Sequence, residues 1–190
     1  MHNTVWGKLV QGILEAASSA NFNVEALLAA IELDSSVLEN ADVRVPQEKL
    51  FALWQELINS SGEESIGLYL AEFARPANFD VIGYVYASSL NFGEGLSRLA
   101  RYSRLFSEDR ECTLETNEKL ARYTYSVPSS YMAFPAYYQW NSANIILQGR
   151  RITGRNLIPQ EVGFQCQQPS DLSAYRRLFR APLKFEQPVN

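Results

Sequence analysis

The chain has 190 residues, of which 46% are hydrophobic and 20% are charged, and its formal net charge at pH 7 is −4. These proportions are typical of one globular domain and exclude a disordered chain or a membrane protein, and the net acidity argues against a chain that binds nucleic acid by itself. One histidine, His2, and two distant cysteines, Cys112 and Cys166, are too few for a histidine-dependent nucleophilic mechanism or for a zinc site.

The cysteines and the N-terminus also bear on the compartment. We expect the two cysteines to be reduced core residues, with a disulfide between them as the alternative. Residues 1–21 lack the basic start and the continuous apolar block of a signal peptide. The sequence therefore predicts a cytoplasmic protein without a membrane-spanning segment, a metal ion or a cofactor.

The first 75 residues have the periodicity of helices. Apolar residues recur at helical spacing from Val5 onward. Asn23 and Asp34 are suited to cap a second helix and a short third one, and Pro46 is suited to open the next. Residues 1–77 are therefore predicted to form a helical subregion.

Residues 78–190 mix helices and strands. Residues 81–90 fit either type, and Asn91 followed by Glu94 is a capping signal for a helix. After that helix the pattern predicts two strands, a long helix, a strand, a helix capped by Ser170 and a last strand, at residues 111–116, 120–127, 135–152, 162–166, 171–179 and 183–185. Helices followed by a ββαβαβ unit indicate an α+β fold with a small, mostly antiparallel sheet.

Residues 123–149 carry no charged side chain, and most of the long helix lies in this tract. A solvated surface helix is seldom uncharged over more than three turns, so we expect this helix to be central. Four polar side chains fall on one of its faces: Tyr137, Asn141, Asn144 and Gln148. Either backbone groups and neighbouring side chains satisfy them, or they line a cavity and orient a small molecule.

Aromatic side chains are frequent in the same tract and in residues 81–90. Such side chains are more often plain core than ligand contacts. If both segments face one space, its occupant is expected to be neutral or weakly polar, for example a fatty acid or an aromatic compound. An ionised ligand would need a pairing charge, for which Arg101 and Arg122 are the nearest candidates in sequence.

Short fragments in a fixed order carry a family resemblance between about Asn23 and Pro188: Arg44–Pro46, Ile66–Leu70, Asn78–Tyr84, Ser88–Glu94, Leu99–Tyr102, Pro169–Phe179 and Pro182–Phe185. In their order and spacing they make the chain resemble the N-terminal effector-sensing domain of AraC/XylS-type bacterial transcription regulators, in the arabinose-binding-like subgroup. The resemblance implies a homodimeric domain that is not an enzyme. In it, a small effector shifts the conformational populations and so controls an attached DNA-binding domain.

Members of that family continue into a domain with two helix-turn-helix units, which this chain lacks. Residues 1–190 are thus expected to be one regulatory domain, either part of a longer regulator or a natural stand-alone copy, that reaches DNA only through the missing part. Seven residues are predicted to line the effector site: Tyr84, Tyr123, Tyr125, Tyr137, Tyr138, Asn141 and Asn144.

Two other functions stay open at this point. One is a protein-interaction module without a ligand, which uses its exposed helices to recruit a partner or to dimerise. The other is an enzyme of unfamiliar type, which would need a titratable cluster in a cleft.

Overall fold

The computed structural model describes residues 3–40, 42–75, 88–108, 110–126 and 134–190. In chain order this part contains β1 (Thr4–Trp6), α1 (Gly7–Ser19), α2 (Val24–Ala30), the 3₁₀ helix η1 (Ser35–Leu38), β2 (Arg44–Pro46), α3 (Gln47–Ser61), α4 (Ile66–Phe73), α6 (Phe92–Arg101), α7 (Ser103–Phe106), β3 (Glu111–Thr116), β4 (Ala121–Ser126), α8 (Pro135–Thr153), β5 (Val162–Gly163), α9 (Ser173–Phe179) and β6 (Leu183–Lys184). The α+β class and the ββαβαβ order after the N-terminal helices are confirmed.

The strands of the described part form three separate pairs. β1 pairs with β2 and β3 pairs with β4, both antiparallel, whereas β5 and β6 are parallel. The mostly antiparallel character is therefore confirmed, but β1 and β2 were not foreseen. Val5, expected on the first helix, lies fully buried in β1 opposite Val45, because a strand made by pairing with a distant segment leaves no periodicity of its own.

The capping signals were mostly correct. Asn23 Oδ1 accepts a hydrogen bond from the Ala26 amide at 3.1 Å, and Asn91 Oδ1 accepts one from the Glu94 amide at 2.9 Å. The prediction for the last helix was wrong, since its N-cap residue is Leu172, which makes no side-chain capping bond, and Asp171 Oδ1, not Ser170, accepts the Ser173 amide at 2.8 Å. An ionised carboxylate is the stronger acceptor at a helix N-terminus, where the helix dipole also favours it.

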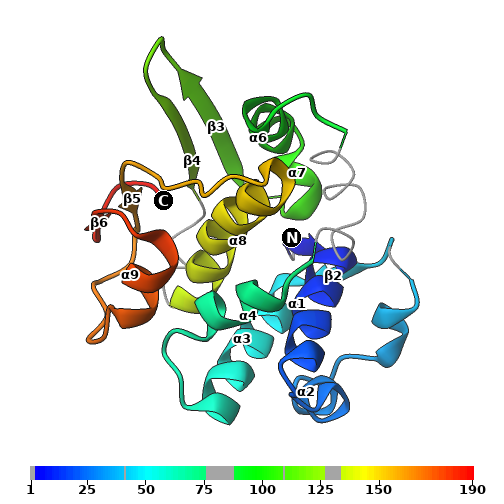
Figure 1. Ribbon diagram of the computed structural model, residues 1–190. Helices are drawn as coiled ribbons and strands as arrows, with labels where there is room; N and C mark the ends of the chain where they lie inside the picture. Colours follow the sequence, from blue (N-terminus) through cyan, green and yellow to red (C-terminus); the bar gives the residue numbers. More distant parts are fainter. Residues whose placement is uncertain (1–2, 41, 76–87, 109, 127–133) are drawn as a thin grey trace.

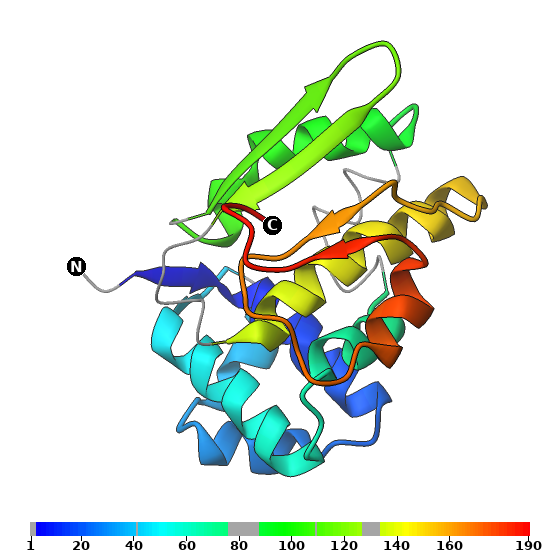
Figure 2. The same cartoon turned by 90° about the vertical axis from the view of Figure 1, so that its left-hand side faces the viewer.

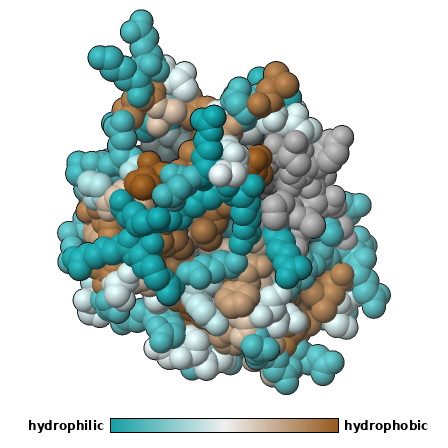
Figure 3. All heavy atoms as spheres, viewed as in Figure 1, coloured by the Kyte–Doolittle hydropathy of each residue, from teal (hydrophilic) through white to brown (hydrophobic). Residues whose placement is uncertain are grey.

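α8 occupies the centre of the molecule, as its lack of charge predicted. In Figures 1 and 2 it runs between the helices α1, α3 and α4 on one side and the β3–β4 hairpin on the other, with β5, β6 and α9 beside it. Trp140 of α8 is 1% exposed and its ring lies 5.8 Å from that of the fully buried Trp54 in α3. Figure 3 shows hydrophilic side chains across one face, with apolar side chains visible between them near its centre.

α4 approaches α8 unusually closely at Gly67. A Cβ atom at this position would lie 2.1 Å from the carbonyl oxygen of Ala136 and 2.8 Å from Gln139 Cβ. The Gly67 amide donates to Gln139 Oε1 at 3.0 Å, and Gln139 Nε2 donates to the Glu64 carbonyl at 2.8 Å and to the Tyr175 hydroxyl at 2.9 Å. One buried amide side chain of α8 thereby joins α4 and α9.

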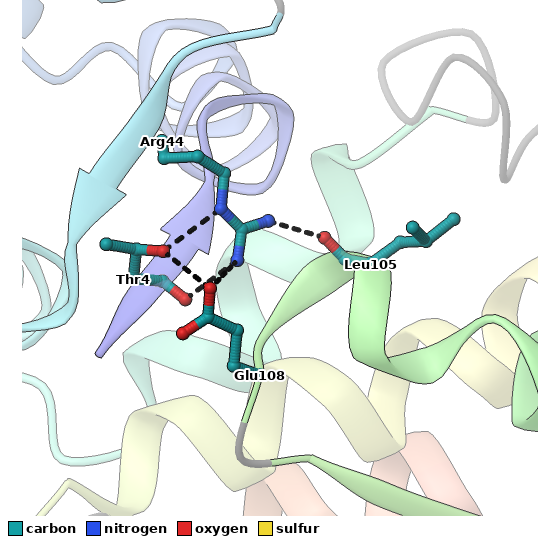
Figure 4. Close-up of polar contacts among 4 residues, drawn as sticks. All are labelled: Thr4, Arg44, Leu105 and Glu108. Atoms are coloured by element: carbon teal, nitrogen blue, oxygen red, sulfur yellow. Dashed lines mark hydrogen bonds and ion pairs between the residues drawn. The ribbon is translucent and has the colours of Figure 1, made fainter. Parts of the chain in front are cut away.

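The N-terminal part is joined to the α7–β3 segment through Arg44 (Figure 4). Its Nε donates to Thr4 Oγ1 at 3.0 Å, Nη1 donates to the Leu105 carbonyl at 2.9 Å, and Nη2 donates to the Thr4 carbonyl at 3.1 Å. Glu108 Oε1 lies 3.4 Å from Nη2 and accepts the Thr4 hydroxyl at 3.2 Å. Arginine can make these contacts together because its guanidinium carries several N–H donors in one plane, a planar fork that the single ammonium group of lysine lacks.

We predict that Gly67→Ala lowers the free energy of unfolding by about 3 kcal/mol, because a methyl group has no room against the α8 backbone. Gly93→Ala is the control, since its Cβ would meet only Asn91 Oδ1, at 3.3 Å, among the described residues. Urea unfolding followed by circular dichroism measures both, and equal midpoints would contradict the close packing of α4 on α8.

We further predict that Arg44→Lys costs about 1–2 kcal/mol, because lysine keeps the charge but loses the fork. Arg104→Lys should change stability by less than about 0.5 kcal/mol, since the Arg104–Glu111 ion pair at 3.5 Å is highly exposed. A loss of the same size in both variants in the urea experiment would show that Arg44 acts as an ordinary surface charge.

Candidate functional site

The β3–β4 hairpin presents one face to α8. Its register pairs Cys112 with Tyr125 and Leu114 with Tyr123, so these four side chains share a face. Tyr125 is 2% exposed, and its hydroxyl donates to the Tyr138 carbonyl at 3.1 Å and lies 3.1 Å from Ser142 Oγ. The hairpin is thus held to the middle of α8 by hydrogen bonds as well as by apolar contact.

Arg110, which precedes β3, lies buried at this junction and is 5% exposed. Its Nη1 donates to Asn141 Oδ1 at 2.9 Å and its Nε lies 3.2 Å from Cys112 Sγ. The guanidinium carbon is 5.0 Å from the ring centre of Tyr125 and 6.0 Å from that of Phe106. The Tyr137 hydroxyl is also hydrogen-bonded to the Arg110 guanidinium, and among the ion pairs of the described residues none involves Arg110.

The polar row on α8 is partly satisfied by the helix itself. Asn141 Nδ2 donates to the Tyr137 carbonyl at 2.7 Å, and Asn144 Nδ2 donates to the Trp140 carbonyl at 2.8 Å. Gln148 Nε2 lies 3.4 Å from the Ala74 carbonyl. The buried Asn144 Oδ1 and Gln148 Oε1 have no partner in the described part of the chain, so the backbone satisfies only half of these two amides.

Two tyrosines of α8 complete the arrangement. Tyr137 and Tyr138 are fully buried, with ring centres 6.1 Å apart, and the Tyr138 hydroxyl has no partner among the described residues. Burial raises the pKa of the Tyr125, Tyr137 and Tyr138 hydroxyls, and for Tyr125 and Tyr137 the Arg110 cation opposes part of that shift. All three hydroxyls are therefore neutral at physiological pH and can donate a hydrogen bond.

No group of three histidine, cysteine, aspartate or glutamate side chains suited to a metal ion occurs among the described residues. Cys112 and Cys166 are both free thiols, as expected from the sequence. Among the helices of the described part, none combines the length and the apolar composition that crossing a membrane requires.

A family model described as the N-terminal arabinose-binding domain of AraC transcription regulators matches residues 22–190. The chain belongs to this AraC family. No curated protein sequence matches the chain. Among solved structures, the AraC-family chain is similar to the transcriptional regulator CdpR from Pseudomonas aeruginosa, with 18% identity and a TM-score of 0.49 over 85% of this chain. It spans half the length of CdpR, since the similarity covers 50% of that protein.

Of the seven residues predicted for the effector site of this AraC-family domain, six are described. Four of them lie around Arg110, namely Tyr123, Tyr125, Tyr137 and Asn141. Tyr138 adjoins this group through its carbonyl, which accepts the Tyr125 hydroxyl, while its own hydroxyl lies near Cys166, and Asn144 follows Asn141 one turn along the helix. Tyr84 lies outside the described residues. That these side chains contact an effector stays a prediction.

Sequence reasoning missed Arg110. The two arginines considered as a pairing charge, Arg101 and Arg122, are both exposed. The alternating pattern of β3 could have identified it, because side chains at every second position of a strand share a face. Continued back from Leu114 and Cys112, this pattern reaches Arg110 and places all three side chains on the buried face.

We predict opposite effects of removing two neighbouring hydroxyls. Tyr125→Phe should cost about 1 kcal/mol, because it breaks the hydrogen bond to α8, whereas Tyr138→Phe should be neutral or stabilising, because it removes a buried hydroxyl without a partner. Urea unfolding of both variants tests this. A loss in Tyr138→Phe as large as in Tyr125→Phe would mean that the Tyr138 hydroxyl is bonded in the folded chain.

Proposed function

We propose that residues 1–190 act as one regulatory domain of a cytoplasmic transcription regulator, which binds a small organic effector between the β3–β4 hairpin and α8. The observation that carries the proposal is the incomplete satisfaction of buried polar groups on α8. The Tyr138 hydroxyl and Asn144 Oδ1 have no partner in the described part. Each such group is destabilising unless a ligand or water bonds to it, and polar groups in an otherwise apolar wall are what fixes the orientation of a small ligand.

The surroundings indicate the character of the effector. Phe106, Tyr123 and Tyr125 supply apolar ring surface, and Tyr137 and Tyr138 supply neutral hydroxyls. A molecule with an apolar or aromatic body and few polar groups fits this lining.

Control of an attached DNA-binding domain follows from the way the hairpin is held. The Tyr125 hydroxyl joins β4 to the α8 backbone, and Arg110 joins the start of β3 to Asn141. An effector that contacts both elements would favour one position of the hairpin on α8, and a difference in affinity between two positions is what shifts their populations. The proposal includes a homodimer and assigns DNA contact to a further domain.

Native mass spectrometry of the chain purified under mild conditions tests the ligand and the dimer together. We expect a dimer mass and, on each protomer, the added mass of a small organic molecule that is released on denaturation. A monomer without bound mass that also fails to respond to a metabolite panel in thermal-shift assays would favour the ligand-free interaction module.

The site assignment has its own test with the released molecule. Tyr138→Phe is expected to weaken its binding about tenfold, which corresponds to the loss of one hydrogen bond. Tyr69→Phe is the control, since Tyr69 is 42% exposed on α4. Undiminished binding to Tyr138→Phe in isothermal titration calorimetry would place the effector elsewhere.

A further inference from the structure

Residues 188–190 are held against the β3–β4 hairpin. The Tyr125 amide donates to the Asn190 carbonyl at 2.9 Å, and the Asn190 amide donates to the Tyr125 carbonyl at 3.1 Å. Two residues that exchange both backbone hydrogen bonds in this way form one pair of an antiparallel ladder. In Figures 1 and 2 the end marked C lies beside the end of the hairpin that is far from its turn. A segment 65 positions away in sequence is therefore bonded to the edge of β4.

Tyr125 connects this contact to the proposed effector site. Its backbone faces Asn190, whereas its side chain is 2% exposed and its hydroxyl bonds to the Tyr138 carbonyl and to the Ser142 hydroxyl on α8. A ring that is closely packed in the interior has little freedom to move apart from its own backbone. A shift of the hairpin on α8 would therefore displace the two backbone groups that bond to Asn190.

The other side of the segment is held by Gln165, which comes shortly after β5. The Gln165 amide donates to Asn190 Oδ1 at 3.0 Å, its Nε2 donates to the Pro188 carbonyl at 3.1 Å, and Asn190 Nδ2 donates to its Oε1. Phe164, directly before Gln165, is fully buried, and its ring stacks on that of Phe185 with the ring centres 5.3 Å apart. Gln165 is thus anchored in the core, and Asn190 bridges this anchor and the hairpin.

The contact with β4 is small enough to open while the rest of the domain stays folded. It consists of the two backbone bonds between Tyr125 and Asn190 and a longer one, at 3.5 Å, from Asn190 Nδ2 to the Tyr125 carbonyl. Val189 is 36% exposed, so little apolar surface supports these bonds. A few hydrogen bonds contribute much less than the stability of a whole domain, and contacts of this kind open locally. The position of the hairpin can therefore decide whether the contact is made.

We propose that residues 188–190 form a latch, which is docked on β4 while Tyr125 is bonded to α8 and is released when the hairpin shifts. The proposal rests on the function proposed above, in which a DNA-binding domain is attached beyond Asn190, and it names the route by which the effector site controls that domain. An effector that holds the hairpin on α8 would keep the latch docked and fix the start of the segment that follows. Coupling between two contacts is reciprocal, so a docked latch would in turn favour the effector-bound position of the hairpin.

Amide hydrogen exchange of the ¹⁵N-labelled chain, read by NMR without any ligand, tests the coupling. Tyr125→Phe removes the hydroxyl on the α8 side and leaves the backbone pairing chemically intact. We expect the Asn190 amide to exchange about threefold faster or more in this variant, because the opening of the latch becomes easier. Tyr138→Phe is the matched control, since it removes a neighbouring buried hydroxyl that has no partner among the described residues, and it should leave the Asn190 rate unchanged.

Two further variants separate the latch from general stability. Gln165→Ala removes the side-chain bonds to Pro188 and Asn190 from outside the effector site, and it should also speed exchange of the Asn190 amide if Tyr125→Phe does not fold. Asn23→Ala removes the N-cap of α2, where Asn23 Oδ1 accepts the Ala26 amide, and so lowers stability far from the latch. It should leave the Asn190 rate as in the parent chain.

Two results would overturn the proposal. An Asn190 rate in Tyr125→Phe equal to that of the parent would show that the hairpin packing and the latch are not coupled. Equal acceleration in Asn23→Ala would show that residues 188–190 open only when the whole domain unfolds. Either result would leave the effector site as proposed, because no ligand enters this measurement. A chain without co-purified mass whose Asn190 amide still responds to Tyr125→Phe would reject the effector and support the coupling.

Discussion

The contact between α4 and α8 at Gly67 sets the positions of the other elements. Two helices approach this closely only where a residue without a side chain meets the backbone of its partner, and the carbonyl of Ala136 lies where a Cβ atom would be. Gln139 then satisfies groups on α4 and α9 at once, so three helices share one buried amide. The charged residues that follow the uncharged tract extend this arrangement, because Arg150 donates to the Leu178 carbonyl at the end of α9, and Arg151 to the Glu72 and Ala74 carbonyls at the end of α4.

α4 and α9 contact one side of α8, and the β3–β4 hairpin contacts the opposite side. Gln139 and Asn141 are two residues apart, which is about 200° around a helix, so they face in nearly opposite directions. Gln139 points to α4 and α9, where all its contacts are internal, and Asn141 points to Arg110. One helix thus has a face that holds the fold together and a face whose polar groups the described residues satisfy only in part, and the proposed effector site lies on the second face.

Much of this could be predicted from the sequence, for physical reasons that differ from element to element. The central position of α8 followed from the absence of charge between Tyr123 and Gly149, and Gly154 ends the helix in a left-handed conformation with φ +63°. Caps such as Asn23 are local and were correct. β1 could not be predicted, because three residues that pair with a segment forty positions away have no local signature. Arg110 could not be assigned to the site in this way, because it precedes β3, outside the uncharged tract, and reaches Asn141 only through the packing of the hairpin on α8.

Hydrogen–deuterium exchange, read peptide by peptide, tests most directly the claim that α8 is the buried axis of the domain with one side open to a ligand. In the ligand-free chain the amides of α8 should exchange slowest, at the rate of global unfolding, and those of α2 much faster. A bound effector should slow exchange in the β3–β4 hairpin and leave α2 unchanged. Exchange of α8 as fast as that of α2, or protection by the effector at α2 and not at the hairpin, would contradict it.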